Sequence, residues 1–275
     1  MKFKLFLFIA VLGFTFSLGA QELTAVSINI RYNSSNDGDD LWDLRKDEVV
    51  AHIAAQNPVV FGVEEATHIQ MQFIDKHFPN YTYVGGGRDD GKTKGEYSAI
   101  FYRKDQLELL EENTFWLSTT PEKVSKGWDA AIKRVCTYAQ FKHIESGRRF
   151  WHFNTHFDHI GQEARIQSAI LIREKIKSVN KAQLPVILSG DFNALPEEQP
   201  IVELKKAFKD PLEHTALIGP IGTFNGFELD MQPDRRIDYI FSNGFKVKSY
   251  SHLEDKRKNG RWISDHLAVS TVLSF

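Results

Sequence analysis

Two short polar residues follow the apolar run at residues 184–188, at the point where a strand is expected to end. They are Asp191 and Asn193, in the segment LSGDFNALP. Gly, Asp, Asn and Pro are turn formers, so a simple turn is one explanation for them. The other explanation is a metal or phosphate site, because a charged and a neutral oxygen ligand stand close together. The polar residues elsewhere in the chain decide between the two.

Similar side chains stand at the ends of the other expected strands. One such residue is more often a satisfied turn or cap than a ligand, but seven strand ends that carry Asn, Asp, Glu or His are harder to explain in this way. In a layered fold, strand ends are where separate segments meet at one site. The set comprises Asn29, Glu64, Glu65, Glu96, Asn154, His156, Asp191, Asn193, Asp238, Asp265 and His266.

The types of these residues favour hydrolysis of a phosphate ester. Oxygen ligands from Asn, Asp and Glu suit a hard cation such as Mg²⁺, Ca²⁺ or Mn²⁺. His156 and His266 have carboxylates available, and a carboxylate fixes the tautomer of an imidazole. A cation with oriented histidines suits attack of water on phosphorus. The sequence has no HExxH segment and a single cysteine, Cys136, so a zinc protease or cysteine-rich zinc site is not expected.

The elements that must position these residues are many strands and few helices. Apolar residues at spacings of three and four predict helices over 43–57, 67–78 and 163–180. Together with the short turns between strands, this predicts an α+β fold, a four-layer αββα sandwich of two mixed β-sheets flanked by helices. Alternating, aromatic and β-branched runs predict strands at 23–30, 59–65, 97–103, 134–144, 148–157, 184–188, 235–241, 245–253 and 266–275.

The first twenty residues differ from the rest of the chain. Lys2 and Lys4 precede a nearly continuous apolar run, and small residues follow it. This pattern is typical of a secretory signal peptide with a core too short for a stable membrane anchor. It predicts a signal peptide at 1–20, one domain over 21–275, and an exported protein that is periplasmic or extracellular. We expect that domain to be a monomer.

The charge balance limits the partners of the expected domain. Without Lys2 and Lys4 the chain has 32 Lys and Arg against 36 Asp and Glu. Strong non-specific binding of nucleic acid usually needs a basic excess, so it is not expected here, although a local basic cleft is compatible with this balance. Two basic stretches flank the candidate site, Arg235–Arg236 and residues 255–262. They fit either phosphate recognition at the rim of the site or a solvated loop.

Seven segments of the chain, in this order, resemble the endonuclease/exonuclease/phosphatase superfamily. They are SINI, VEEA, GEYSAIFYR, NTHFDH, GDFNALP, RIDYIF and SDHLAV. The resemblance spans residues 24–275, and its most specific part is the ordered triple GDFN, IDYIF and SDHL. Residues 115–141 are similar to the bacterial exported branch. The superfamily includes deoxyribonucleases, abasic-site endonucleases, deadenylases, neutral sphingomyelinases and inositol-polyphosphate phosphatases, and its fold is the αββα sandwich.

The resemblance implies a divalent cation, Mg²⁺ or Mn²⁺, and assigns residues to it. Glu65 matches the principal metal-ligand glutamate, with Asn29 beside it and Asp265 as a metal or support ligand. The family pattern usually has Gln before this glutamate, whereas Glu64 stands there in this sequence. Glu64 therefore either lies on the opposite face of the strand or shares the metal, and we favour Glu65 as the ligand.

The resemblance also assigns the catalytic groups. Asp191 matches the residue that positions or deprotonates the attacking water. His266 matches the catalytic histidine, and Asp238 matches the carboxylate that orients it.

Phosphate contacts follow from the same matches. Asn193 matches a residue that hydrogen-bonds the phosphate, and His156 matches a phosphate-contacting histidine with Glu96 as its partner. Arg134 stands where several members place a phosphate-contacting arginine.

These assignments together predict a metal-dependent hydrolase of phosphate esters, either a nuclease-like phosphodiesterase or a phosphatase, with nucleic acid or nucleotides among the possible substrates. The segments GDFNALP and RIDYIF resemble the deadenylase-like and nuclease-like branches. A lipid-headgroup phosphodiesterase of the sphingomyelinase type is the alternative, although no apolar hairpin for membranes is evident. A catalytically silent binding domain is less favoured, because every core position is filled.

Overall fold

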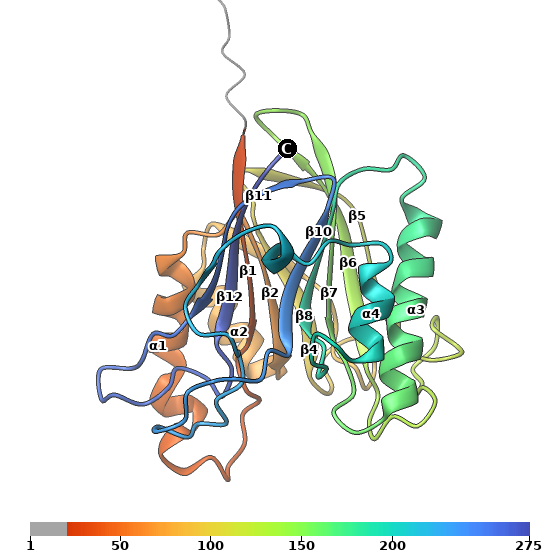
Figure 1. Cartoon of the computed structure of the whole chain (residues 1–275). Coiled ribbons are helices and arrows are strands. Elements are labelled where there is room, and N and C mark those ends of the chain that lie inside the picture. The colour runs from red at the N-terminus through yellow and green to blue at the C-terminus, as the bar shows by residue number, and fades with distance from the viewer. Residues whose placement is uncertain (1–20) are drawn as a thin grey trace, which may run out of the picture.

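Two β-sheets face each other in the computed structural model, which describes residues 21–275, and helices cover the outer faces of both sheets (Figure 1). The predicted fold class, an α+β sandwich of four layers, is confirmed. Both sheets are mixed, since each contains parallel and antiparallel pairs.

The larger sheet brings the first and last strands of the described chain side by side, because β1 and β12 pair antiparallel from Glu22 and Ser274 onward. It has seven strands, in the order β3 (Tyr81–Val84), β4 (Tyr97–Arg103), β2 (Val60–Ala66), β1 (Glu22–Asn29), β12 (Ala268–Ser274), β11 (Lys246–Leu253) and β9 (Leu217–Ile218). The smaller sheet has five, in the order β10 (Asp238–Asn243), β8 (Val186–Asp191), β7 (Arg149–His156), β6 (Val135–His143) and β5 (Leu107–Trp116).

Three layers of apolar side chains hold the sandwich together. Helices α1 (Trp42–Ala55) and α2 (His68–His77) pack on the larger sheet, and α3 (Gln162–Val179) and α4 (Gln199–Lys205) pack on the smaller one. A third cluster, which includes Ile100, Phe141, Ile187 and Val269, fills the space between the sheets. Strands buried on both faces carry continuous apolar runs, as in VIL of β8. Two short 3₁₀-helices, η1 (Gly38–Asp40) and η2 (Pro211–Glu213), lie in the loops.

The strand pairings bring the polar strand ends to one end of the sandwich. β1 and β2 run parallel, as do β7 and β8, so the last residues of each pair lie at the same edge. β4 and β12 run antiparallel to β2 and β1, so their first residues lie at that edge too. In the smaller sheet β10 begins where β8 ends, since Asp238 pairs with Asp191. Topology, rather than closeness in sequence, therefore assembles the candidate site.

The three helices expected from the sequence correspond to α1, α2 and α3, but α4, β3, β5 and the two-residue strand β9 were not predicted. α4 has only seven residues, with Pro200 in its first turn, and it follows a segment rich in turn formers. In β5 a β-bulge between Leu109 and Glu111 interrupts the pairing with β6. An extra residue reverses the face on which later side chains lie, so the alternation typical of a strand is lost.

The predicted signal peptide at residues 1–20 lies outside the described residues. Between residues 21 and 275, no helix is both long enough and apolar enough to cross a membrane.

Candidate active site

A cavity of about 510 Å³ opens where the polar strand ends meet. Eight predicted site residues line it: Glu65, Glu96, Arg134, His156, Asp191, Asn193, Asp265 and His266. The other two, Asn29 and Asp238, lie behind the lining, where each contacts a lining residue. The lining also includes side chains that were not among the predicted site residues: Arg31, Tyr32, Ile132, His159, Phe224, Arg235 and Ile237.

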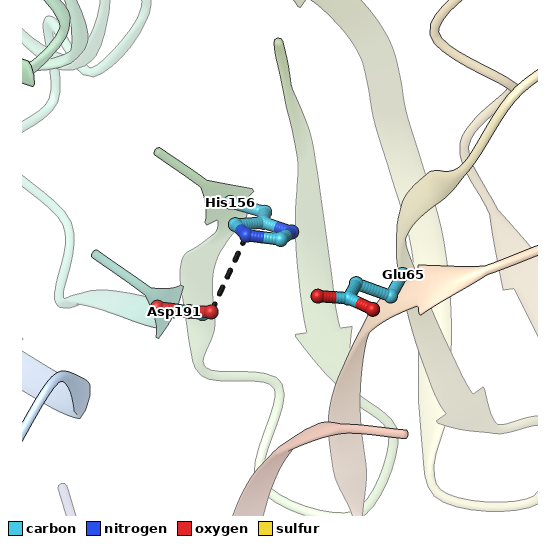
Figure 2. Close-up of side chains that lie close together, drawn as sticks. All are labelled: Glu65, His156 and Asp191. Carbon is cyan, nitrogen blue, oxygen red and sulfur yellow. Dashed lines mark ion pairs between the residues drawn. The ribbon is translucent and has the colours of Figure 1, made fainter. Parts of the chain in front are cut away.

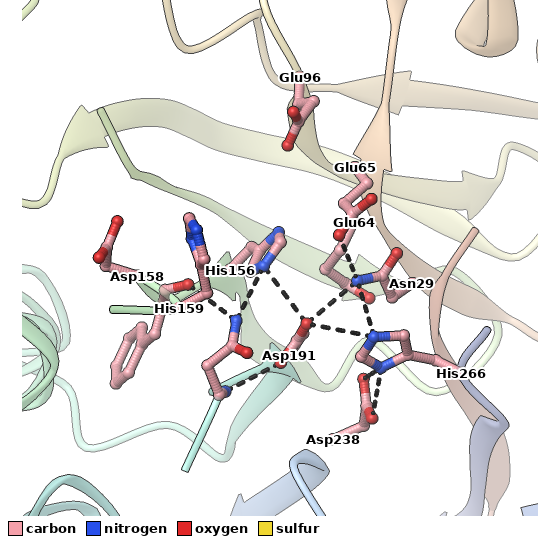
Figure 3. A network of polar contacts seen from close by, with 12 residues as sticks. Asn29, Glu64, Glu65, Glu96, His156, Asp158, His159, Asp191, Asp238 and His266 are labelled. Carbon is pink, nitrogen blue, oxygen red and sulfur yellow. Dashed lines mark hydrogen bonds and ion pairs between the residues drawn. The ribbon is translucent and has the colours of Figure 1, made fainter. Parts of the chain in front are cut away.

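His266 is held by a carboxylate on one ring nitrogen and faces the cavity with the other (Figure 3). Its Nδ1 lies 2.9 Å from Oδ2 of Asp238, and its Nε2 lies 3.8 Å from Oδ2 of Asp191. Burial lowers the pKa of His266, but these two carboxylates outweigh it and place the pKa well above its usual value. Thr223 was missed by the sequence reasoning. Its Oγ1 donates to Asp238 at 2.6 Å and accepts the N–H of Asp238, which fixes that carboxylate.

Asp191 lies at the centre of the polar network. Its Oδ2 accepts a hydrogen bond from Nδ2 of Asn29 at 3.0 Å, and its Oδ1 accepts the N–H of Asn193 at 2.9 Å. The carboxylate is almost completely buried. Burial and the nearby Asp238 raise the pKa of Asp191 to about 7, although His266 opposes this. A group that titrates near neutrality is suited to proton transfer.

Asn193 and His156 contact each other beside Asp191. Nδ2 of Asn193 lies 3.1 Å from Nε2 of His156 and donates to the carbonyl oxygen of Phe157 at 3.1 Å. Burial, followed by the positive charge of Arg134, lowers the pKa of His156 well below its usual value, so His156 is neutral at neutral pH. The predicted donation from Asn193 to a phosphate requires its amide to release one of these contacts.

A β-bulge turns Glu65 toward the cavity. In the pairing of β2 with β4, Glu64 lies opposite Ser98 and Ala66 opposite Tyr97, so Glu65 is the extra residue. Its φ of 61° is left-handed, a conformation that costs energy in a residue with a side chain. Oε1 of Glu65 accepts from Asn29 at 3.0 Å, and Oε2 accepts the N–H of Tyr32 at 3.0 Å.

Glu64 points in the other direction, into the space between the sheets. It is completely buried, and its Oε1 accepts from Ser27 at 3.3 Å. Burial raises its pKa well above the usual value. Glu64 is not part of the cavity lining, so the geometry favours Glu65 as the ligand of the adjacent pair.

The residues around Glu65 fit a divalent cation. Ligand atoms of Glu65, His156 and Asp191 lie within 4.8 Å of one another (Figure 2). Burial raises the pKa of Asp265 to about 6, and the negative charge of Glu65 adds to this effect. Carboxylates crowded in this way are stabilised by a cation, and oxygen donors are the ligands that Mg²⁺ and Mn²⁺ prefer. The sequence assigns this cation to Glu65, Asn29 and Asp265. In the structure the ligand atoms that gather are those of Glu65, His156 and Asp191, and Asn29 donates its amide N–H to Glu65.

Glu96 does not pair with His156, which corrects one predicted role. Its carboxylate instead makes a two-pronged ion pair with Arg88, at 2.6 and 2.7 Å. Both partners come from the loop that leads into β4, so the loop closes on itself. Glu96 lines the cavity wall but does not orient His156 in the structure of residues 21–275.

Arg134 precedes β6 and reaches the cavity as the sequence predicts, but its neighbours were not foreseen. Its Nε lies 3.5 Å from Oδ2 of Asp158, and its Nη2 lies 3.0 Å from Nδ1 of His159. Asp158 in turn accepts the N–H groups of Ala131 and Gly161. Both Asp158 and His159 belong to the NTHFDH segment, whose final DH was the available signal.

Comparison with known families identifies the family of this chain. Residues 26–266 match the Endonuclease/Exonuclease/phosphatase family. The chain belongs to this family. The matched range contains all ten predicted site residues, from Asn29 to His266. The match to the Endonuclease/Exonuclease/phosphatase family therefore includes every residue that lines the cavity.

Two solved structures from Bacteroides thetaiotaomicron resemble the chain along nearly its whole length. One is an endonuclease/exonuclease/phosphatase family protein, 38% identical, with a TM-score of 0.88, covering 93% of this chain and 98% of that chain. The other is a mannosyl-6-phosphatase, also 38% identical with a TM-score of 0.88, covering 92% of this chain and 100% of that chain. These similarities support a phosphoesterase of this family.

A curated relative matches over a shorter range. An uncharacterized protein of Acanthamoeba polyphaga mimivirus is 31% identical over 159 residues, which are 55% of this chain and 59% of the viral protein. The match thus spans less than two thirds of that relative.

Proposed function

We propose that this protein is an exported, divalent-metal-dependent hydrolase of phosphate esters. The observation that carries the proposal is the convergence of Asp191, the His266–Asp238 pair and Glu65 on one cavity. Family membership supports the reaction class. Export rests on the signal peptide predicted at residues 1–20, and fractionation of expressing bacteria would test it.

Each residue has a role in attack of water on phosphorus. Asp191 accepts a proton from the water at Oδ2, within reach of the amide of Asn29. His266, oriented through Nδ1 by Asp238, presents Nε2 to the phosphoryl oxygens. Arg134 adds positive charge to the cavity lining. Glu65 would hold a divalent cation, which would supply positive charge to the phosphoryl oxygens.

For the substrate we propose a phosphomonoester of a sugar. The support is the mannosyl-6-phosphatase, which is 38% identical and is matched over its whole length. The nuclease-like and sphingomyelinase-like alternatives make different predictions. Release of orthophosphate from hexose phosphates, measured beside single-stranded DNA, bis(p-nitrophenyl) phosphate and sphingomyelin at one metal concentration, distinguishes them. Activity confined to sphingomyelin or DNA would contradict the sugar phosphate.

Variants of the central residues test the mechanism. Asp191→Ala and His266→Ala should each lower kcat for a hydrolysed ester by a factor of hundreds or more, because each removes a group that acts in the transition state. His214→Ala is the matched control, since His214 is exposed and lies outside the cavity lining. Melting curves should show that all three variants fold. Unchanged turnover in either cavity variant would contradict the mechanism.

Metal dependence has its own test. EDTA should abolish hydrolysis, and Mg²⁺ or Mn²⁺ should restore it. Turnover that resists the chelator would overturn the assigned role of Glu65, Asn29 and Asp265.

A further inference from the structure

Three of the four arginines that flank the site in sequence are bound to carboxylates away from the cavity. Arg236 is buried and makes two hydrogen bonds of 2.8 Å to Asp210. Arg257 and Arg261 both bind Asp40, which fastens the loop at 255–262 to η1. Neither Arg257 nor Arg261 lines the cavity. These ion pairs give the basic loop a structural role. The loop is therefore not evidence for phosphate recognition at the rim of the site.

Arg235 is different from these arginines. It is exposed and lines the cavity, and within residues 21–275 its side chain has neither an ion pair nor a hydrogen bond. The other arginines of the lining are each placed beside a carboxylate: Arg31 lies 2.9 Å from Asp37, and Arg134 lies 3.5 Å from Asp158. Among the described arginines that line this cavity, Arg235 is thus the one whose positive charge has no carboxylate beside it.

An aromatic ring fixes the position of Arg235 relative to the catalytic centre. The guanidinium lies over the ring of Phe224, 5.5 Å from the centroid of that ring. On the same ring, the centroid lies 5.1 Å from that of His266, whose place in the site is seen in Figure 3. The backbone of Phe224 forms bridges to both Arg235 and His266. Phe224 is half-buried and its side chain is part of the cavity lining. The order from the reacting centre outward is therefore imidazole, aromatic ring, guanidinium.

We propose that Arg235 and Phe224 form a specificity subsite that binds a second phosphate group, carried by the leaving group of the substrate. This inference rests on the proposed function, because it places the reacting phosphate at Asp191 and His266. A guanidinium without a carboxylate partner binds phosphate through paired, charge-assisted hydrogen bonds. The ring of Phe224 packs against the carbon skeleton between the two phosphates. The preferred substrate is accordingly a sugar that carries a second phosphate besides the phosphomonoester that is hydrolysed.

Calorimetric binding of two matched sugars tests the subsite. The probes are glucose 1,6-bisphosphate and glucose 6-phosphate, titrated into the protein with Ca²⁺ in place of Mg²⁺. In the wild type we expect the bisphosphate to bind about tenfold more tightly, which corresponds to one added charge-assisted hydrogen bond. Arg235→Gln should bring the two dissociation constants within about twofold of each other. Arg235→Lys should retain part of the preference, since it keeps the charge but loses the paired geometry.

Arg149→Gln is the matched control, because Arg149 is exposed and stands at the start of β7, whereas His156 ends that strand at the cavity. This control should keep the full preference. The subsite is refuted if the wild type binds both sugars alike or neither, or if Arg235→Gln leaves the preference unchanged. Hydrolysis of the ester panel is measured separately. Hydrolysis without a preference for the bisphosphate would support the proposed function and contradict the subsite. A preference for the bisphosphate without hydrolysis of any ester would support the subsite and contradict the proposed function.

Discussion

The adjacent residues Glu64 and Glu65 are chemically identical, yet the bulge in β2 gives them different surroundings. Glu65 lines the cavity, and Glu64 is enclosed between the sheets. Residue type alone therefore does not tell which of the two glutamates faces the cavity, whereas the backbone conformation at Glu65 does.

A pair of neutral replacements tests this assignment. Glu65→Gln should lower kcat/KM by about a hundredfold or more and raise the Mg²⁺ concentration needed for half-maximal activity, since it removes a charged ligand. Glu64→Gln, its matched control, should change both quantities by less than about threefold. Activity measured as a function of Mg²⁺ gives both numbers. Equal losses in the two variants would show that both glutamates serve the metal.

Asn193 lets us test whether a neutral side chain is needed beside Asp191. Asn193→Asp places a second carboxylate next to the buried Asp191 and against the phosphate, so repulsion is added to the loss of a donor. We expect kcat/KM to fall further in Asn193→Asp than in Asn193→Ala, by about tenfold or more. Steady-state kinetics on one phosphate ester provides the comparison. An aspartate variant more active than the alanine variant would show that charge is not the reason for Asn193.

At the scale of elements, Asn154 joins the two sheets just behind the cavity. It lies on β7, and its Nδ2 donates to the carbonyl oxygens of Val63 on β2 and Ala99 on β4, at 3.3 and 3.0 Å. Ser189 on β8 completes the contacts by donating to Oδ1 at 2.7 Å. Asn154 precedes His156 by two residues and Val63 precedes Glu65 by two, so this amide links the strands that carry these two cavity residues.

Gly62 provides the space that Asn154 occupies. A Cβ at Gly62 would overlap the side-chain amide of Asn154. Gly62→Ala should therefore lower the free energy of unfolding by about 1–3 kcal/mol, the usual cost of overpacking a core. Urea denaturation measures this loss.

A double-mutant cycle is the control for the Gly62 prediction. In an Asn154→Ala background the clash is absent, so the same glycine replacement should cost clearly less. Costs that add independently would show that Gly62 is needed for a reason other than Asn154.

At the scale of the whole molecule, buried histidines make stability depend on pH. His152 and His252 are buried, and burial lowers their pKa to about 3 and about 4, below the value of about 6.5 expected in the unfolded chain. The unfolded chain therefore binds more protons than the fold below pH 6.5, and stability falls as the pH decreases through this range. Between pH 7 and pH 5 we expect a loss on the order of 1–2 kcal/mol for each histidine.

His252→Asn isolates one of these contributions. Asparagine can keep the hydrogen bond that Nδ1 makes to the carbonyl oxygen of Pro220 at 2.8 Å, but it does not titrate. Urea denaturation at pH 7 and pH 5 should show a smaller loss of stability in the variant than in the wild type. The difference between the two proteins removes the contributions of other titrating groups, and an identical pH dependence would contradict the role of His252.

Local sequence pattern determined much of this protein. Hydrophobic spacing predicted α1, α2 and α3, and the αββα architecture followed from many strands with short turns. The ordered motifs identified the family and all ten residues of the candidate set, because their types and positions at strand ends are properties of short segments. The edge strand β5 and the short helix α4 escaped, since a bulge and a proline-containing turn break the local pattern.

Only the tertiary structure decided which of these side chains meet. The bulge at Glu65, the pairing of Glu96 with Arg88 and the position of Asp158 beside Arg134 depend on loop paths and strand register. Thr223 and Phe224 come from the long connection between β9 and β10, where the sequence analysis found no motif. Arg235 was noticed in the sequence only as part of a basic stretch, and the structure places it in the cavity lining. The physical reason is that a contact between residues distant in the chain depends on how every intervening element packs, which the local propensity of a segment does not contain.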